Sequence, residues 1–128
     1  MKTMIRFLNP HQIGGCVTLI TYGDTTICID YGQNLPGADN MRFESIDWKR
    51  EKIDAVFFTH YHGDHIGRFM EIPENVPCYM GNVTRNIEIN IHKHLSSFGE
   101  GAQTHAQMEW RLRSMNPKWE LREKRLRR

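Results

Sequence analysis

The feature that most constrains this chain is a run of six residues, His-Tyr-His-Gly-Asp-His, at positions 60–65. It brings three imidazoles and one carboxylate into one short stretch. The preceding residues, 53–59, are apolar and partly β-branched, which predicts a buried strand. Four metal-ligand side chains therefore converge where a strand ends and a loop begins. Imidazole nitrogen and carboxylate oxygen suit zinc, and also iron or manganese.

The spacing within the run predicts how the ligands divide. His60 and His62 lie on one side of an extended or tightly turned backbone, so together they can hold a first ion. Gly63 lets the chain bend sharply. Asp64 and His65 then point elsewhere and can serve a second ion, and Asp64 is also the candidate catalytic residue because it can orient a water. Two ions about 3.5–4 Å apart form a hydrolytic arrangement that activates a shared water near neutral pH.

His-x-His-x-Asp-His after an apolar strand resembles the signature of the metallo-β-lactamase superfamily of metal-dependent hydrolases. Residues 25–32 resemble that family's early strand, which ends here in Asp30. The Gly14-Gly15-Cys16 segment after Ile13 resembles the opening of the ribonuclease J-like branch. The resemblance implies an α/β fold with two sheets sandwiched between helices. It also implies that Asp30 fixes the metal loop by hydrogen bonding without binding the metal itself.

The same resemblance implies a hydrolase that uses a metal-activated water and one or two zinc ions, with manganese or iron as alternatives. The ribonuclease J-like branch points to RNA phosphodiesters as the substrate, and a small molecule is the other class. The alternative function is a non-catalytic metal-binding or vestigial interaction domain, in which the motif persists without the chemistry.

The family's later ligands are a third His, a bridging Asp and a final His, and no Asp follows Asp64 in this sequence. We therefore expect residues 1–116 to form a partial metallo-β-lactamase-like domain. A truncated chain of this kind is impaired when alone. It would be completed by a homo-oligomer or by a complementing second half, and would otherwise leave an apolar sheet face exposed.

The rest of the chain predicts alternating strands and helices, which is an α/β layout. Gly23-Asp24 joins two strands as a hairpin. Asn82 is expected to be the N-cap of a helix, and a second helix is expected at about residues 102–115. The other expected strands cover residues 4–8 and 77–80, and the first helix is expected to bury a stripe formed by Val83, Ile87, Ile91, Leu95 and Phe98.

The histidines outside the 60–65 run are not expected to bind metal. His92 and His94 are two residues apart on a helix, so they point in opposite directions and do not chelate together. His11 lies in a Gly-flanked loop, where a solvated side chain is the expectation. His105 lies near the start of the second helix, where an exposed side chain is expected.

The net charge of +2 is unevenly distributed. Residues 1–110 carry nine Lys/Arg and thirteen Asp/Glu, whereas residues 111–128 carry eight and two. The basic tail at 117–128 is expected to be disordered or a frayed helix, with an RNA-binding arm as the alternative.

The three cysteines (Cys16, Cys28 and Cys78) form no Cys-x-x-Cys pair. They are expected to be buried free thiols in a reducing compartment, and a metal-ligand role for any one of them is the alternative. No signal peptide is evident, and no apolar run approaches the roughly 20 residues that cross a membrane. A cytoplasmic protein without membrane partners is therefore expected.

Overall fold

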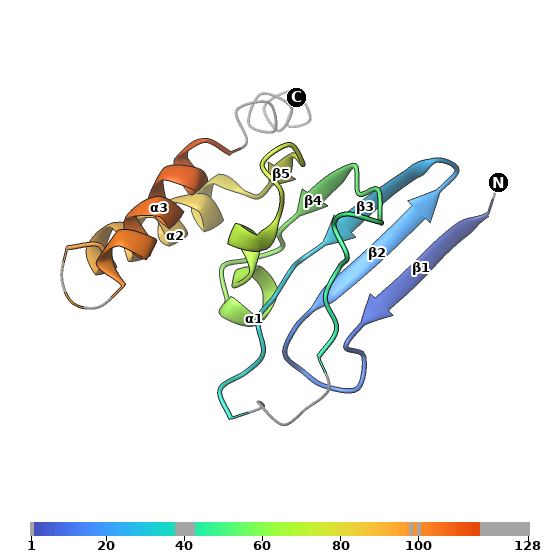
Figure 1. Cartoon of the computed structure of the whole chain (residues 1–128), viewed down its shortest axis with the longest axis horizontal. Coiled ribbons are helices and arrows are strands. Elements are labelled where there is room, and N and C mark those ends of the chain that lie inside the picture. Colours follow the sequence, from blue (N-terminus) through green and yellow to red (C-terminus); the bar gives the residue numbers. More distant parts are fainter. Residues whose placement is uncertain (1, 38–42, 98, 100, 116–128) are drawn as a thin grey trace. The chain divides into compact units, whose positions relative to one another are not determined.

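The computed structural model describes residues 2–37, 43–97, 99 and 101–115. It confirms the predicted α/β class (Figure 1). The predicted tail at 117–128 and Phe98 lie outside the described residues. The elements are β1 (Thr3–Leu8), β2 (Val17–Tyr22), β3 (Thr25–Ile29), β4 (Ala55–Phe57), α1 (Gly63–Ile66), the 3-10 helix η1 (Phe69–Glu71), β5 (Cys78–Tyr79), α2 (Asn82–Leu95) and α3 (Ala102–Arg113).

The strands form one sheet in the order β1-β2-β3-β4-β5. β1, β2 and β3 pair antiparallel, and β3 pairs parallel with β4. The predicted hairpin between β2 and β3 is present, and Gly23 supplies its left-handed residue with φ 59°. β4 is shorter than the predicted strand at 53–59, since it ends at Phe57. The backbone N–H of Thr59 leaves the strand ladder and donates to the Asp30 side chain at 2.8 Å.

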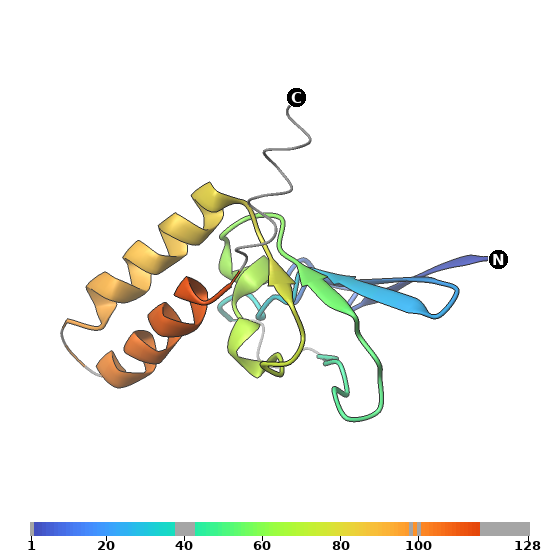
Figure 2. The same cartoon turned by 90° about the horizontal axis from the view of Figure 1, so that it is seen from above.

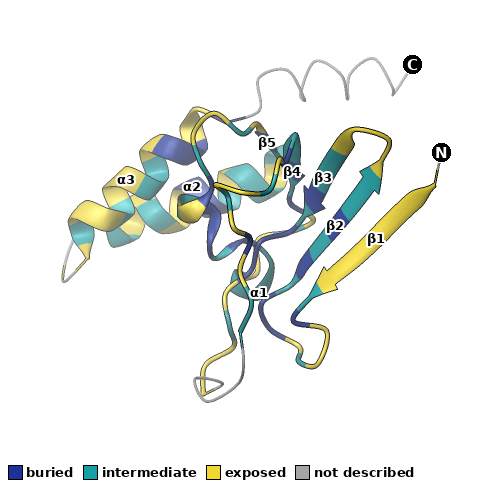
Figure 3. Cartoon of the chain, turned by 45° about the vertical axis from the view of Figure 1, so that its right-hand side comes forward, coloured by how far each residue is buried: buried dark blue, intermediate teal, exposed yellow. Residues whose placement is uncertain are grey.

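The two faces of the sheet differ in burial (Figure 3). One face carries core residues such as Val17, Leu19 and Val56, all nearly inaccessible. On the opposite face, which we call the outer apolar face, no described side chain of β1–β4 is fully buried. Its two cross-strand rows consist of Ile5, Ile20, Ile27 and Ala55, and of Phe7, Thr18, Ile29 and Phe57.

The chain divides into two compact units, residues 1–78 and 79–128, and the described part of the second contains the helical hairpin formed by α2 and α3. Its helices α2 and α3 lie side by side (Figure 2). Both predicted helices are confirmed, although α2 starts one residue early: Gly81 is the N-cap and Asn82 is the first helical residue. None of the described helices has the length and apolar character that a membrane span requires.

The predicted apolar stripe of α2 is wrong. Val83 is 74% exposed and Ile91 is 40% exposed, whereas the buried residues of this helix are Glu88 and Ile89. Polar residues as well as Ile89 lie on the inner face of α2, because the polar side chains make specific bonds to α3. Arg85 donates to the carbonyl oxygens of Leu112 and Arg113, and His92 pairs with His105, as described below.

Candidate metal centre

The residues after β3 bring the parts of the site together. Asp30 leaves β3 in a left-handed conformation, with φ 64°, which Asp tolerates better than most residues. The next residues then run alongside the motif: Tyr31 donates its N–H to the carbonyl of His65 at 2.9 Å, and Gly32 donates to the carbonyl of Cys16 at 3.1 Å. A side chain at Gly32 is excluded, because an added Cβ would lie 1.6 Å from the carbonyl oxygen of Asp64.

Asp30 accepts the hydrogen bonds that hold Thr59 and His65 in position. Its carboxylate is 5% exposed and accepts from the Thr59 N–H at 2.8 Å and from the Thr59 hydroxyl at 2.8 Å. It also lies 2.7 Å from Nδ1 of His65. An ionised carboxylate can only accept, so Nδ1 of His65 carries the hydrogen. In the neutral ring the lone pair of His65 is therefore on Nε2, the tautomer that metal-ligating histidines adopt when a carboxylate supports them.

The same network sets the tautomer of His60. The Thr59 hydroxyl has one hydrogen, which it donates to Asp30. It therefore accepts from Nδ1 of His60, which lies 2.9 Å away. In a neutral ring, the lone pair of His60 is consequently also on Nε2. One buried carboxylate thus fixes the tautomer of two imidazoles of the motif.

The predicted ligands lie close together. The ring centroids of His60 and His65 are 4.0 Å apart, and those of His60 and His62 are 4.7 Å apart. Asp64 Oδ2 lies 3.5 Å from His65 Nε2. The motif bends because residues 63–66 form the short helix α1, where the sequence predicted a loop. Ligation by His60, His62, Asp64 and His65 in the predicted pairs stays a prediction.

The structure adds Cys16 to this group. Within the described ranges, the one set of three metal-type ligands whose donor atoms all lie within 4.8 Å of one another is Cys16, Asp64 and His65. Burial raises the pKa of the Cys16 thiol, and the carboxylates of Asp64 and Asp30 raise it further. Sequence reasoning left Cys16 as one of three equivalent thiols, because it is far from the motif in sequence and belongs to no ligand spacing. Cys28 and Cys78 are buried free thiols, as predicted.

Arg68 is a second residue that the sequence analysis missed. Its guanidinium lies 4.0 Å from the ring centroid of Tyr31 and 4.2 Å from that of Phe43. It donates to the carbonyl of Gly32 at 2.6 Å and to the Ser45 hydroxyl at 2.7 Å. Burial lowers its pKa. Arg68 therefore holds the backbone beside the site in place, a role that no local sequence pattern indicates.

A second group of histidines lies in the helical hairpin. Nδ1 of His92 is 2.8 Å from Nδ1 of His105, and Nε2 of His92 is 3.2 Å from a carboxylate oxygen of Glu88. His105 is half-buried, so the expectation that it is exposed is wrong. His11 is exposed, as predicted.

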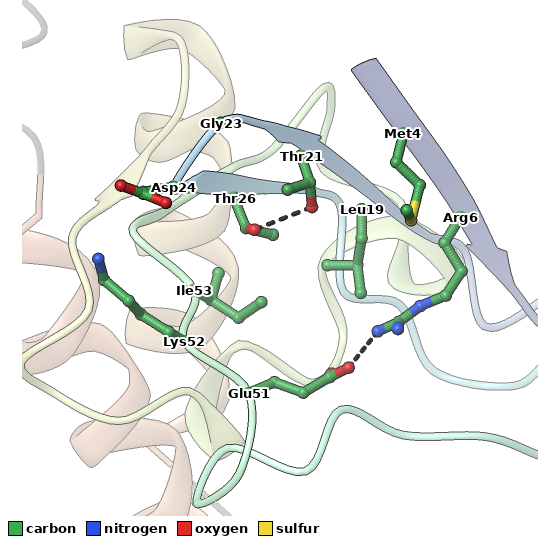
Figure 4. A pocket seen from close by; sticks show the side chains of 10 residues that line it. All are labelled: Met4, Arg6, Leu19, Thr21, Gly23, Asp24, Thr26, Glu51, Lys52 and Ile53. Carbon is green, nitrogen blue, oxygen red and sulfur yellow. Dashed lines mark hydrogen bonds and ion pairs between the residues drawn. The ribbon is translucent and has the colours of Figure 1, made fainter. Parts of the chain in front are cut away.

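A surface hollow of about 320 Å³ lies away from the motif, on the core-side face of the first strands (Figure 4). An ion pair between Arg6 and Glu51 closes one end of it. Its lining includes Leu19, Thr26 and Ile53 but no residue of the 60–65 run. The assignment of the site therefore rests on its side-chain chemistry.

Comparison with known protein families matches residues 14–79, more than half of the sequence, to the Metallo-beta-lactamase superfamily. The chain belongs to this superfamily. The matched region contains Cys16, Asp30 and the whole 60–65 run. The predicted membership is thus confirmed, whereas the ribonuclease J-like branch stays a prediction.

Two proteins are similar to part of this chain. It is 29% identical over 114 residues to the Lactamase-like protein nscB of Trichophyton rubrum, a match that covers 84% of this chain and 32% of that protein. It is 41% identical over 54 residues to the Anti-Pycsar protein Apyc1 of a Paenibacillus species, covering 42% of this chain and 20% of that protein. The chain therefore spans about a third or less of the relatives that it matches.

Proposed function

We propose that this chain carries part of the active site of a metal-dependent hydrolase. The observation that supports the proposal most directly is the Asp30–Thr59 network, which bonds to Nδ1 of His60 and of His65 and so leaves Nε2 of each ring for a metal, with Nε2 of His65 beside Asp64. A buried carboxylate behind a histidine is what a metal ligand needs, since it orients the ring and strengthens the basicity of the other nitrogen.

His60 and His62 would hold the first ion, and Asp64 and His65 the second. Zinc fits this donor set best, with manganese and iron as alternatives. When bound, the metal polarises the scissile group and makes water acidic enough to react near neutral pH. Asp64 accepts hydrogen bonds and can orient that water, and Asp30 holds His65 in place without touching substrate.

RNA phosphodiesters are the substrate class that we propose first. The support is the resemblance of residues 13–16 to the ribonuclease J-like branch. The acidic balance of residues 1–110 does not favour a long nucleic-acid groove, so contacts to RNA phosphates would fall to the basic residues at 111–128. A small phosphodiester or ester is the alternative substrate. A cytoplasmic location belongs to the same proposal.

A complementing second half, or a second copy, is the proposed partner. The relatives are three to five times as long as the part this chain matches. The outer apolar face suits such a partner, because Ile5 and Phe7 are 55% and 59% exposed on it. Covering exposed side chains of this size with another sheet is favourable, at about 1.5–3 kcal/mol for each one fully buried.

The test is metal content per chain by elemental analysis, with the mass by size exclusion measured on the same fractions. We expect bound zinc in a defined oligomer or complex, and hydrolysis of RNA or of bis(p-nitrophenyl) phosphate. His62→Ala should lose metal and hydrolysis together. Bound metal without hydrolysis of phosphodiesters or esters would favour the non-catalytic metal-binding domain, and absence of metal binding would contradict both functions.

A further inference from the structure

Cys16 is fixed against the metal motif by the backbone on both of its sides. Its own N–H donates to the carbonyl of Asp64 at 3.1 Å, and its carbonyl accepts from the N–H of Gly32 at 3.1 Å. Gly32 in turn approaches Asp64 so closely that no side chain fits there. The thiol position is therefore set by the same strand–loop contacts that position Asp64.

Two of the distances between the donor atoms are close to those of a tetrahedral zinc site. Cys16 Sγ lies 3.8 Å from His65 Nε2, and His65 Nε2 lies 3.5 Å from Asp64 Oδ2. Zinc bond lengths of about 2.3 Å to sulfur and about 2.0–2.1 Å to nitrogen or oxygen give tetrahedral edges of about 3.4–3.6 Å. All three donor atoms lie within 4.8 Å of one another, so one ion can reach them together if the side chains adjust.

The nitrogen that faces the thiol is the one with the lone pair. Asp30 occupies Nδ1 of His65, so Nε2 is the atom directed at both Cys16 and Asp64. The thiol also lies 3.2 Å from the carbonyl of Ile13, which is the bond it makes as a neutral S–H. Cys28 and Cys78 differ, because their sulfurs lie against the backbone carbonyls of Asp30 and Val76.

We propose that Cys16 is a direct thiolate ligand that completes, with Asp64 and His65, a three-residue site for zinc. This inference rests on the proposed metal-dependent function and deepens it, since it supplies a ligand from within the chain. Thiolate is a soft donor, so the site should prefer zinc to manganese or magnesium, which favour oxygen ligands.

Cobalt substitution tests the inference directly, because a thiolate bound to Co²⁺ adds a sulfur-to-metal charge-transfer band in the near ultraviolet to the visible d–d bands. The full chain loaded with Co²⁺ should show both. Cys16→Ser should lose the charge-transfer band, keep weaker d–d bands and bind zinc at least tenfold less tightly. Cys78→Ser is the matched control and should keep the band.

The outcomes separate the two proposals. A d–d spectrum without a charge-transfer band in the native chain, or a band that persists in Cys16→Ser, would overturn the Cys16 assignment and leave the metal-binding function intact. Failure of the native chain to bind either Co²⁺ or Zn²⁺ would overturn the function as well. If Cys16→Ser does not fold, alkylation of the native chain decides: zinc should protect Cys16 from iodoacetamide, and equal labelling with and without zinc would contradict the inference.

Discussion

The chain holds two groups of histidines, and they use their nitrogens differently. In the motif, Nδ1 of His65 bonds to Asp30 and Nδ1 of His60 bonds to Thr59, and Nε2 of His65 lies beside Asp64 and Cys16. In the helical hairpin, the two nitrogens of His92 are used by Glu88 and by His105.

The hairpin pair is a hydrogen-bonded pair and not a chelate. The ring planes of His92 and His105 differ by 25°, and the ring centroids are 5.1 Å apart. That separation equals the 2.8 Å between the Nδ1 atoms plus the distance from each ring centroid to its own Nδ1. The two nitrogens therefore lie on the line between the rings and face each other directly. One shared hydrogen fits this geometry, whereas two lone pairs that converge on a metal would meet at an angle. Proximity of histidines therefore indicates a metal site only when their hydrogen bonds leave converging lone pairs.

The largest effect is expected from Gly32→Ala. The new Cβ would overlap the carbonyl of Asp64, which α1 holds in place, so the loop and the motif cannot keep their contacts. We expect a loss of more than about 4 kcal/mol in the free energy of unfolding and no zinc binding.

Gly81→Ala is the matched control, because nothing lies within 4 Å of its added Cβ and its φ of −66° is ordinary. Chemical denaturation followed by circular dichroism measures both variants. A Gly32→Ala chain as stable as the control would show that the close approach to Asp64 is not needed.

Asp30→Asn should lower zinc affinity without removing a ligand. The carboxylate accepts from the Thr59 N–H, the Thr59 hydroxyl and Nδ1 of His65, whereas an amide has only one acceptor oxygen. The tautomers of His60 and His65 are then no longer fixed. Loss of such a supporting carboxylate typically costs 10–100-fold in metal affinity, and about that range is expected here.

Competition with a chromophoric zinc chelator gives the affinity. Asp54→Asn is the control, since its carboxylate accepts from the Thr26 N–H at 2.8 Å in another part of the same unit. Equal zinc affinities for the two variants would refute the supporting role of Asp30.

The sequence predicted the elements that depend on local chemistry. The β2–β3 hairpin follows from Gly23, and the resemblance to the metallo-β-lactamase superfamily placed Asp30 in support of the metal loop. Features set by long-range contacts could not be predicted. Cys16 reaches the site through backbone bonds to residues far along the chain, and the inner face of α2 is chosen by bonds to α3 that override its apolar spacing.

The hairpin pair should contribute modest stability and no metal binding. His92→Ala and His105→Ala each remove one side of the same hydrogen bond, so a double-mutant cycle should give a coupling free energy of about 1 kcal/mol, within the range for contacting residues. Zinc stoichiometry should remain that of the native chain in all three variants. A drop in bound zinc on replacing His105 would show that the pair is a ligand set after all, and the contrast between the two groups would fail.

The smallest effect is expected at Val83, and it tests which face of α2 is buried. Val83 is 74% exposed, so Val83→Ala removes little packing and gains helix propensity; the free energy of unfolding should change by no more than about 0.5 kcal/mol. Ile89 is 6% exposed, so Ile89→Ala should cost about 2–5 kcal/mol. Urea denaturation compares the two. If Val83→Ala lowered the free energy of unfolding nearly as much as Ile89→Ala, Val83 would have to be buried, as the apolar stripe predicts. The face of α2 that carries Ile89 and His92 would then not be the one that packs.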